Sequence, residues 1–585
     1  MTISIIAIKD CFKDAEEGSR VVPHFNFLDI EDDSPFRFMR MQPKEALAAS
    51  PDEGVRHTSG HHLKKCREAL RTAHMERADL LLTPEYCIPA ELIIEIIQNS
   101  ELQPRPNTLW CLGCQGMSLD SFRDHMMQWG DSAIVGSGAL AGMRENRFVN
   151  FLLYVFRSKE SSKLCLVPQL KLQRMREPLF VCEGAGLSLG KKVIMFGDQS
   201  ANQLFSIMCA DAFHPEIKSG GLFFPNREPR RYIILHPQLN PAPRSPDIAA
   251  LRNRIFDQTS SRNVIYITSN WAYGTIIQTE DGRPLAIQAP WSSIYRRFIS
   301  LDGRQSWNEQ LREARSLNFR HGLGLGFQPA KKIKVWFAIK SEHLQLILLT
   351  KPYDGGAELV QPRAGVQAEK AFIASDSGNW EHAELPFSSE LPAVLAEDAV
   401  EEFAYPRTAS VENLDKFFGY CLGHLEDGQL SLSDQEHSTR LSCHIDEQCE
   451  PGRGQEARRI VRLIRCLRQK DSLPNQLKKF EGNFLFQLGA RAPINLLPSS
   501  GDEKDGALVI YTDNDVMMDK IVFDIYKALP GVELFLEDKI CVFSQNPKGE
   551  TVHYPYFSEL WTSPVHSNHS TEFTQGGLLI DAGLD

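Results

Sequence analysis

The chain has 585 residues, a formal net charge of −11 at pH 7 and a pI near 5.9. Its 42% hydrophobic and 24% charged residues are typical of a globular protein, which excludes a disordered or collagen-like chain. The length predicts two or three domains, because it exceeds what one hydrophobic core usually organises. The negative charge provides no global positive field for nucleic acid or an anionic membrane surface.

The first residues predict a β-strand over 2–8, because the apolar run TISIIAI lacks the basic region and the small-residue cleavage site of a signal peptide. The sequence has no run of about 18 uncharged apolar residues, so we expect no membrane span. The 13 cysteines are too sparse for a disulfide scaffold and are interpreted as reduced thiols. These features predict a cytoplasmic protein.

Residues 1–354 alternate short apolar runs with amphipathic stretches, which predicts an α/β domain. Strands are predicted at 79–86, 132–140, 148–156, 191–197, 203–210, 231–237 and 263–270, and helices at 61–78 and 248–262. Most of these strands are continuous apolar runs, as expected for a sheet that is covered on both faces. A closing hairpin is predicted from 332–339 and 344–350.

Residues 355–397 are rich in Ala, Gly, Glu, Pro and Ser with weak periodicity, which predicts a linker. The remainder, 398–585, is predicted to be a smaller α+β domain. It contains a basic amphipathic helix within 454–469 and a strand–helix–strand–strand unit over 506–544. The arginines of that basic helix are typical of a solvated face, and they also suit a protein partner or a polyanion. We assign no activity to this region.

The segment QLFSIMCADAFHPEI brings Cys209 to the end of an apolar strand, directly before a predicted turn. A thiol at such a corner projects from the sheet, and the N–H of Ala210 then faces a bound carbonyl as an oxyanion donor. Taken alone, an apolar-flanked cysteine is more often an inert core residue.

Two charged residues occupy similar positions at the ends of predicted strands. In DLLLTPEY, Pro84 ends the strand and places Glu85 at its terminus, where a carboxylate with a raised pKa can act as general base, although a solvated loop glutamate is the more common case. Lys171 follows the apolar strand before it. Such a lysine is usually on the surface. If it turned inward, it could lower the pKa of a thiol and stabilise an oxyanion.

These three segments together resemble the nitrilase, or carbon–nitrogen hydrolase, superfamily, whose members carry Glu, Lys and Cys in this chain order. The nucleophile motif of that family matches Cys209, Asp211, Phe213, Pro215 and Glu216. The resemblance covers most of residues 1–353 and implies a four-layer αββα sandwich that pairs as a homodimer or larger homo-oligomer. It also departs from the family pattern: Ala210 replaces a frequent aromatic, and the segment around Lys171 lacks the aromatic-x-Lys-x-His pattern.

The resemblance implies that Glu85, Lys171 and Cys209 hydrolyse an amide or nitrile through a thioester. Glu85 would take the thiol proton and later activate water, and Lys171 with the Ala210 N–H would hold the oxyanion. Glu177 would match a second family glutamate that orients the lysine, and Asn270 would match an asparagine near the nucleophile. This mechanism requires no metal and no organic cofactor.

The main alternative is a non-catalytic scaffold or sensor with the same fold, within a regulatory or defence assembly. A glutaminase fused to a synthetase would need an ATP-binding motif after residue 353, and a lipoprotein-type acyltransferase would need membrane spans; the sequence shows neither. Cys111 and Cys114 form a C-x-x-C without a second pair, which favours two strand thiols over a zinc site, and the cluster of Cys443, His444 and Cys449 is similarly incomplete.

Overall fold

The computed structural model divides the chain into two compact units, which are described separately. The first comprises Met1–Ser389 with Asp446–Cys449, and the second comprises Glu390–Ile445 with Glu450–Asp585. The structure describes residues 2–352, apart from 16–20, 30–33, 161, 176–179, 198–201, 219–230, 242–250, 252–254, 257–263, 281, 283, 288–291, 298–320, 329–332 and 340, and then residues 365–385. It also describes 463, 466–468, 475–482, 484–486, 496–498, 505–512, 540–545 and 551–553.

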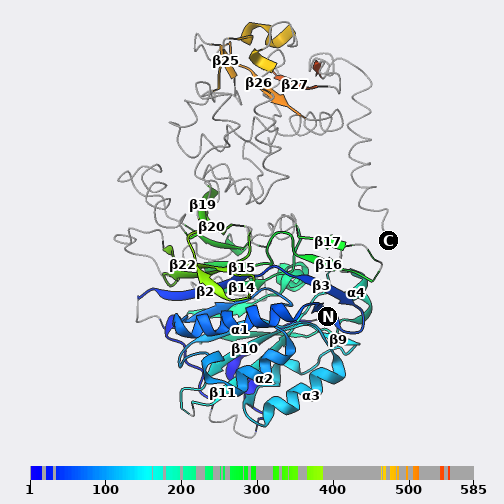
Figure 1. Ribbon diagram of the computed structural model, residues 1–585, viewed down its shortest axis with the longest axis vertical. Helices are drawn as coiled ribbons and strands as arrows, with labels where there is room; N and C mark the ends of the chain where they lie inside the picture. Colours follow the sequence, from blue (N-terminus) through cyan, green and yellow to red (C-terminus); the bar gives the residue numbers. More distant parts are fainter. Residues whose placement is uncertain are drawn as a thin grey trace. The chain divides into compact units, whose positions relative to one another are not determined.

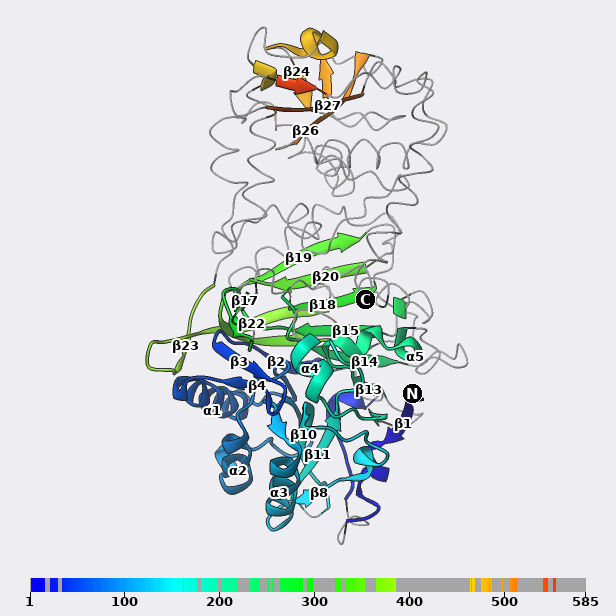
Figure 2. The ribbon, with the colours of Figure 1, turned by 90° about the vertical axis from the view of Figure 1, so that its right-hand side faces the viewer.

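The first unit is a mixed α/β structure whose described strands form two large sheets (Figures 1 and 2). The nine-stranded sheet has the order β23 (Trp380–His382), β22 (Val366–Ala374), β21 (His343–Leu349), β2 (Phe36–Gln42), β5 (Leu80–Leu82), β6 (Leu109–Gly113), β10 (Phe151–Arg157), β11 (Leu164–Leu170) and β8 (Ile134–Val135). The eight-stranded sheet has the order β1 (Ser4–Ala7), β12 (Lys192–Phe196), β13 (Gln203–Ser206), β14 (Tyr232–Pro237), β15 (Val264–Ser269), β18 (Ser293–Arg297), β20 (Ile333–Ala338) and β19 (Leu323–Gln328).

Side chains that cross between the two sheets show that the sheets pack face to face. The rings of Tyr154 on β10 and Phe196 on β12 lie 4.8 Å apart between centroids. Gln169 on β11 donates through Nε2 to the carbonyl of Ser206 on β13, at 3.0 Å. These buried contacts satisfy the amide of Gln169 inside an otherwise apolar core, as a buried polar group requires.

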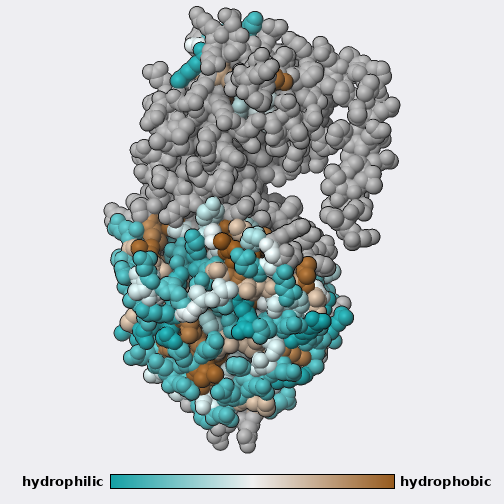
Figure 3. Space-filling view, turned by 45° about the vertical axis from the view of Figure 1, so that its right-hand side comes forward, coloured by the Kyte–Doolittle hydropathy of each residue, from teal (hydrophilic) through white to brown (hydrophobic). Residues whose placement is uncertain are grey.

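Three amphipathic helices cover the outer face of the nine-stranded sheet: α1 (Gly60–Met75), α2 (Ala90–Gln98) and α3 (Leu119–Gly130). Their buried residues, such as Leu70, Ile93 and Trp129, belong to one apolar cluster with Leu81 and Leu153 of the sheet. Among the described helices, none combines the length and apolar character needed to cross a bilayer. The coloured part of the face in Figure 3 is mostly hydrophilic with scattered hydrophobic spots, as is normal for a water-exposed surface.

On the outer face of the eight-stranded sheet, the helical residues Leu251, Ile255 and Phe256 pack against Ile234 and Tyr266 of β14 and β15. They lie in the predicted helix 248–262, of which the structure describes only these residues. β13, β14 and β15 run parallel and are buried, as their continuous apolar sequences predict.

Two smaller sheets complete the described part of the first unit. One has the order β17 (Pro284–Ala286), β16 (Ile276–Gln278), β3 (Ala46–Ser50) and β4 (Gly54–His57), and the other pairs β7 (Met117–Ser118) with β9 (Phe148–Val149). The remaining helices that carry site residues or flank them are short: α4 (Phe180–Gly186), the 3₁₀ helix η6 (Cys209–Phe213) and α5 (Pro215–Lys218).

The predicted hairpin from 332–339 and 344–350 is wrong, because its two strands join different sheets. β20 pairs with β18 and β19, whereas β21 pairs with β2 and β22. Gln42 at the end of β2 donates to the carbonyls of Ile339 and Ser341, so hydrogen bonds hold the connection as it crosses between the sheets. Two adjacent apolar runs cannot show from sequence alone whether they pair with each other.

The predicted linker 355–397 also needs correction. Its described part forms β22 and β23, and β22 pairs antiparallel with β21 at the edge of the nine-stranded sheet. Trp380 of β23 is buried and donates through Nε1 to the carbonyl of Lys65 on α1. The first unit therefore extends beyond the predicted boundary at 354, and it is followed by the second unit from Glu390.

The described part of the second unit contains two small sheets, one 3₁₀ helix, and the helical residues 463 and 466–468, which lie in the predicted basic helix 454–469. β24 (Phe484–Phe486) pairs with β25 (Leu496–Pro498), and η10 spans Asn475–Phe480. β26 (Leu508–Tyr511) pairs in parallel with β27 (Ile540–Gln545), which also pairs with β28 (Thr551–His553). The strands predicted at the two ends of 506–544 are confirmed, whereas the helix and the middle strand predicted between them lie outside the described residues.

Candidate functional site

The candidate site lies where several strands of the first unit end. Glu85 follows β5, Lys171 follows β11 directly, and Cys209 begins η6 just after β13. Leu239 and Asn270 follow β14 and β15. β13, β14 and β15 are parallel, so their carboxyl ends meet at one edge of the sheet, where α/β proteins commonly place their ligands.

Lys171 is held between two buried carboxylates. Its Nζ lies 2.7 Å from Oε1 of Glu85 and 2.6 Å from Oε1 of Glu183 on α4, and all three side chains are fully buried. Burial by itself lowers the pKa of Lys171, but the charges of Glu183 and Glu85 raise it overall. Lys171 is therefore a charged ammonium group inside the core, and the two carboxylates fix the position of its Nζ.

Hydrogen bonds from distant parts of the chain fix both the side chain and the backbone of Glu85. Oε1 accepts from Nδ2 of Asn150 at 2.7 Å, and Oε2 accepts from the N–H of Leu239 at 3.2 Å. Its backbone carbonyl accepts from Nε1 of Trp271 at 2.8 Å. Burial, with the nearby charge of Glu183, raises the pKa of Glu85 despite the adjacent Lys171. A carboxylate with a raised pKa is suited to accept and return a proton near neutral pH.

Cys209 lies beside this ion pair, and the backbone of Leu239 connects the two. Its Sγ lies 3.8 Å from the carbonyl of Leu239, whose N–H donates to Glu85. Burial and the charge of Glu85 hold the pKa of the thiol well above its usual value, whereas the charge of Lys171 lowers it. The resting thiol is thus protonated, and it is close enough to both charged groups for each to affect its ionisation.

The backbone of Cys209 is strained, which is unusual for a residue that only fills a core. Its φ is +34°, in the left-handed region that non-glycine residues rarely adopt. The carbonyl of Cys209 accepts a hydrogen bond from His236, whose Nε2 lies 3.0 Å away. Burial lowers the pKa of His236 to about 4, so the imidazole is neutral. Strain of this kind persists only where surrounding contacts fix it, and it often marks a functional residue.

Asp211 anchors the turn that carries the thiol. Oδ1 accepts from the N–H groups of Leu172 and Gln173, at 2.8 and 2.9 Å, and Oδ2 accepts from the N–H of Met208 at 3.0 Å. One carboxylate therefore ties the segment after Lys171 to the residue before Cys209. This explains physically why an aspartate two residues after the cysteine suits the site.

We expect Asp211 to make stability pH-dependent. Burial raises its pKa from 3.8 to about 7 in the folded protein, so its contribution to stability is fully present below about pH 4 and is lost as the pH rises through 7. Urea unfolding of wild type and Asp211→Asn from pH 4 to pH 8 measures this effect. The wild type should lose on the order of a few kcal/mol more than the variant across that range. Equal pH slopes would contradict this assignment.

The other predicted supporting residues have different outcomes. Ala210 is fully buried in η6, next to the thiol. Asn270 is also fully buried and holds Asn240 through two hydrogen bonds, from Asn240 N to its Oδ1 at 3.1 Å and from its Nδ2 to the carbonyl of Asn240 at 2.7 Å. It therefore positions the residue next to Leu239. Glu177 lies outside the described residues.

Glu183 is the main site residue that sequence reasoning missed. Its Oε1 contacts Lys171 and accepts from the hydroxyl of Tyr86 at 2.9 Å, and its Oε2 accepts from the N–H of Met175 at 2.6 Å. The available signal was its place in the apolar segment FVCEGAG, where an unpaired carboxylate would be costly. Asn150 was also missed, because a lone asparagine between two strands has no distinctive pattern.

A glycine beneath the Glu85 loop allows the close approach that positions this carboxylate. A Cβ on Gly113 would lie 2.0 Å from the carbonyl oxygen of Pro84 and 2.9 Å from Cα of Glu85. The N–H of Gly113 donates a hydrogen bond to Oγ1 of Thr83 at 2.8 Å, which further fixes the position of the Gly113 backbone. The backbone of the loop therefore rests directly on β6.

Gly113→Ala should lower the free energy of unfolding by about 2–3 kcal/mol, because rigid backbone atoms must move to admit the methyl group. Gly130→Ala is the matched control, since a Cβ there meets nothing within 4 Å and the helical position tolerates alanine. Urea unfolding of both variants measures the difference. A Gly113→Ala variant as stable as the control would show that the loop does not rest on β6 as described.

The two cysteine clusters noted in the sequence also have different outcomes. Cys111 on β6 and Cys114 just after it are both buried and free, which agrees with two thiols in the core. Cys443, His444 and Cys449 lie outside the described residues.

Comparison with protein-family models and with curated proteins finds no match to this chain.

Proposed function

We propose that the first unit is a carbon–nitrogen hydrolase of the nitrilase type, which cleaves an amide or nitrile through a thioester on Cys209. The observation that carries this proposal is the ion pair between Lys171 and Glu85 beside the strained backbone of Cys209. A buried charge pair is costly to assemble, and it adds little to stability compared with apolar packing. Its retention next to a thiol is explained if the three groups act together.

The proposed reaction begins with proton transfer from Cys209 to Glu85. The sulfur attacks the amide or nitrile carbon, and Lys171 stabilises the negative charge that develops on the oxygen or nitrogen of the substrate. For an amide, protonated Glu85 then donates to the leaving amine, and the C–N bond breaks to leave a thioester. Glu85 next removes a proton from water, which attacks the thioester and releases the acid and the free thiol.

Glu183 is proposed to take the orienting role that the family resemblance assigned to Glu177. It contacts Nζ of Lys171 and keeps the ammonium charged, so that Lys171 is fixed before substrate binds. Preorganisation of this kind matters because a charge already in place need not reorganise during the reaction. Asn150 supports both partners, since its side chain donates to Glu85 and its carbonyl accepts from the N–H of Lys171.

The four-layer αββα arrangement belongs to the same proposal. It is supported by the two facing sheets, by α1, α2 and α3 over one outer face, and by Leu251, Ile255 and Phe256 on the other. The family resemblance further implies a homodimer or larger assembly. We propose that residues 398–585 select the substrate, a protein partner or the assembly state.

A non-catalytic scaffold or sensor is the second candidate, and one observation favours it. Cys209 is only 1% exposed, and its pKa lies well above the usual value, as for an inert core thiol. In that case the buried charges would only fix the fold around a binding surface.

Ammonia release from panels of amides and nitriles distinguishes the two functions. The full chain should release ammonia from at least one member, and a Cys209→Ala preparation of equal Tm should release none. No release from any member by the wild type would favour the scaffold. Release that persists in Cys209→Ala would reject the thioester mechanism.

A further inference from the structure

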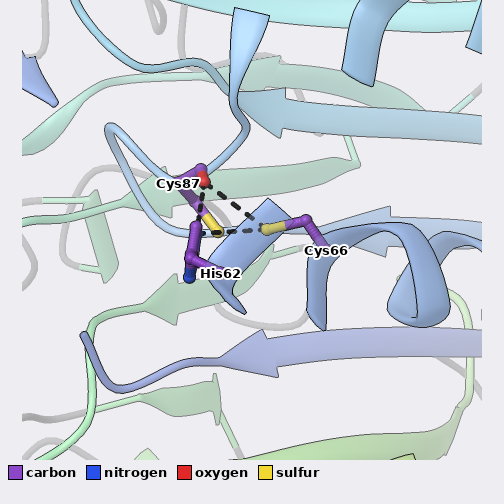
Figure 4. A group of neighbouring side chains, drawn as sticks. All are labelled: His62, Cys66 and Cys87. Atoms are coloured by element: carbon purple, nitrogen blue, oxygen red, sulfur yellow. Dashed lines mark hydrogen bonds between the residues drawn. The ribbon is translucent and has the colours of Figure 1, made fainter. Parts of the chain in front are cut away.

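Three side chains that can bind a metal converge behind the loop that carries Glu85. His62 and Cys66 come from α1, and both point toward Cys87, two residues after Glu85 (Figure 4). The nearest ring nitrogen and the two sulfur atoms all lie within 4.8 Å of one another, and Sγ of Cys66 lies 3.1 Å from Nε2 of His62. All three residues are fully buried.

The ligand types and their placement suit zinc. His62 and Cys66 are four residues apart on α1, so their side chains lie on one face of the helix. Zn²⁺ binds thiolate sulfur at about 2.3 Å and imidazole nitrogen at about 2.0–2.1 Å, so tetrahedral ligand atoms lie roughly 3.5–3.8 Å apart. Here Nε2 of His62 and Sγ of Cys66 lie 3.1 Å apart and all three atoms lie within 4.8 Å of one another, so side-chain shifts of about 1 Å or less would give that spacing.

The second ring nitrogen of His62, Nδ1, faces the carboxylate of Glu45. Nδ1 lies 3.8 Å from Oε2 of Glu45, and it is a buried atom with no hydrogen bond among the residues that the structure describes. Histidine that ligates a metal through one nitrogen commonly directs the other toward a carboxylate, which fixes the ring. The ring also stacks on His57 and on Trp271, with ring centroids 3.9 and 5.5 Å away.

Charge balance also favours a divalent ion in this position. Two thiolates and one neutral imidazole around Zn²⁺ carry no net charge, which a dry interior tolerates, whereas the same ligands around a monovalent ion would leave a negative charge buried. The carbonyl of Cys87 lies 2.7 Å from Nε2 of His62 and 3.6 Å from Sγ of Cys66, inside the same cluster. Without an ion this carbonyl accepts a hydrogen bond from Nε2 of His62, and zinc binding would replace that hydrogen bond.

We propose that His62, Cys66 and Cys87 bind one Zn²⁺ ion, with the carbonyl of Cys87 completing the site. Binding releases two protons, one from each thiol, and no electron is transferred. The remaining proton of His62 resides on Nδ1, facing Glu45. The ion would fix Cys87 and with it the loop that holds Glu85, and this last consequence alone rests on the proposed hydrolase function.

The zinc content of the full chain tests this site directly. The protein is produced in zinc-supplemented medium and purified without a chelator or a metal-affinity column, and its metals are measured by mass spectrometry. We expect about one zinc per chain in the wild type, at least tenfold less in Cys66→Ala and Cys87→Ala, and unchanged zinc in Cys111→Ala. Cys111 is an equally buried cysteine outside the cluster, so it controls for the loss of a core thiol.

A second measurement needs only the wild type, so poor folding of a variant does not affect it. Protein produced with Co²⁺ in place of zinc should show the near-ultraviolet charge-transfer absorption of cobalt bound by two thiolates. Wild-type protein without stoichiometric zinc, a cobalt spectrum without thiolate bands, or a Cys66–Cys87 disulfide in the purified chain would each overturn the proposal. Because these readouts do not involve turnover, an inactive but zinc-bound protein would reject only the hydrolase.

Discussion

Lys171→Met is expected to lower the free energy of unfolding by about 3–5 kcal/mol and to abolish ammonia release. The substitution keeps the length of the side chain but removes the only charge that separates Glu85 from Glu183 in the described site. Two buried carboxylates would then face each other without a cation, and removing one partner of a buried charge pair is strongly destabilising. Urea unfolding and ammonia release measure the two effects.

The double variant Lys171→Met/Glu183→Gln separates stability from catalysis. Removing the second carboxylate relieves the repulsion, and Glu85, whose pKa burial already raises, can take up a proton once Lys171 is absent. We expect most of the lost stability to return while turnover stays absent. If turnover returned with stability, Lys171 would act only in folding, and its proposed oxyanion role would be wrong.

Cys209→Ala is expected to reduce turnover by about 10⁴-fold or more, because the substrate loses its covalent acceptor. The cost in stability should be modest, since only one sulfur atom leaves a core whose neighbouring groups stay paired. Turnover and Tm are measured together, with Cys114→Ala as the control, because Cys114 is also fully buried and lies outside the triad. Equal turnover losses in the two variants would indicate disturbed packing and not a lost nucleophile.

Sequence reasoning located the strand ends well, because strand termination leaves local signals. Pro84 ends β5, and the apolar runs before Lys171 and Cys209 form β11 and β13, so each of the three residues lies just beyond a strand. The contact between Glu85 and Lys171 could not be derived from these patterns alone. It depends on how the strands are ordered in the sheet, and the resemblance in chain order supplied that expectation.

The missed features are those in which distant segments meet. Glu183 lies on α4, twelve residues after Lys171, and its side chain contacts Nζ of Lys171. No local sequence pattern distinguished Glu183 from Glu177. The Leu239 backbone joins Glu85 to Cys209 only because β14 lies beside β13. The false hairpin has the same origin: adjacency in sequence suggested that β20 and β21 pair, although each has closer partners in a different sheet.

The zinc cluster shows why spacing alone is a weak guide to metal sites. The sequence indicated the C-x-x-C of Cys111 and Cys114 and the cluster of Cys443, His444 and Cys449, whereas the proposed zinc site lies elsewhere. It combines two residues of one helix with a cysteine that follows Cys66 by 21 residues. Cys111 and Cys114 instead lie in or beside β6 and within the core. Convergence of this kind becomes visible only when α1 is placed against the loop after β5.

Intact-mass analysis of the wild type during turnover most directly tests whether a thioester forms on Cys209. The protein is mixed with a reactive amide or nitrile, quenched in acid within the steady state and digested for peptide mapping. The proposed mechanism predicts an added mass equal to the acyl group, located on the peptide that contains Cys209 and absent from Cys209→Ala. Ammonia release without any such adduct, or an adduct on a different cysteine, would contradict it.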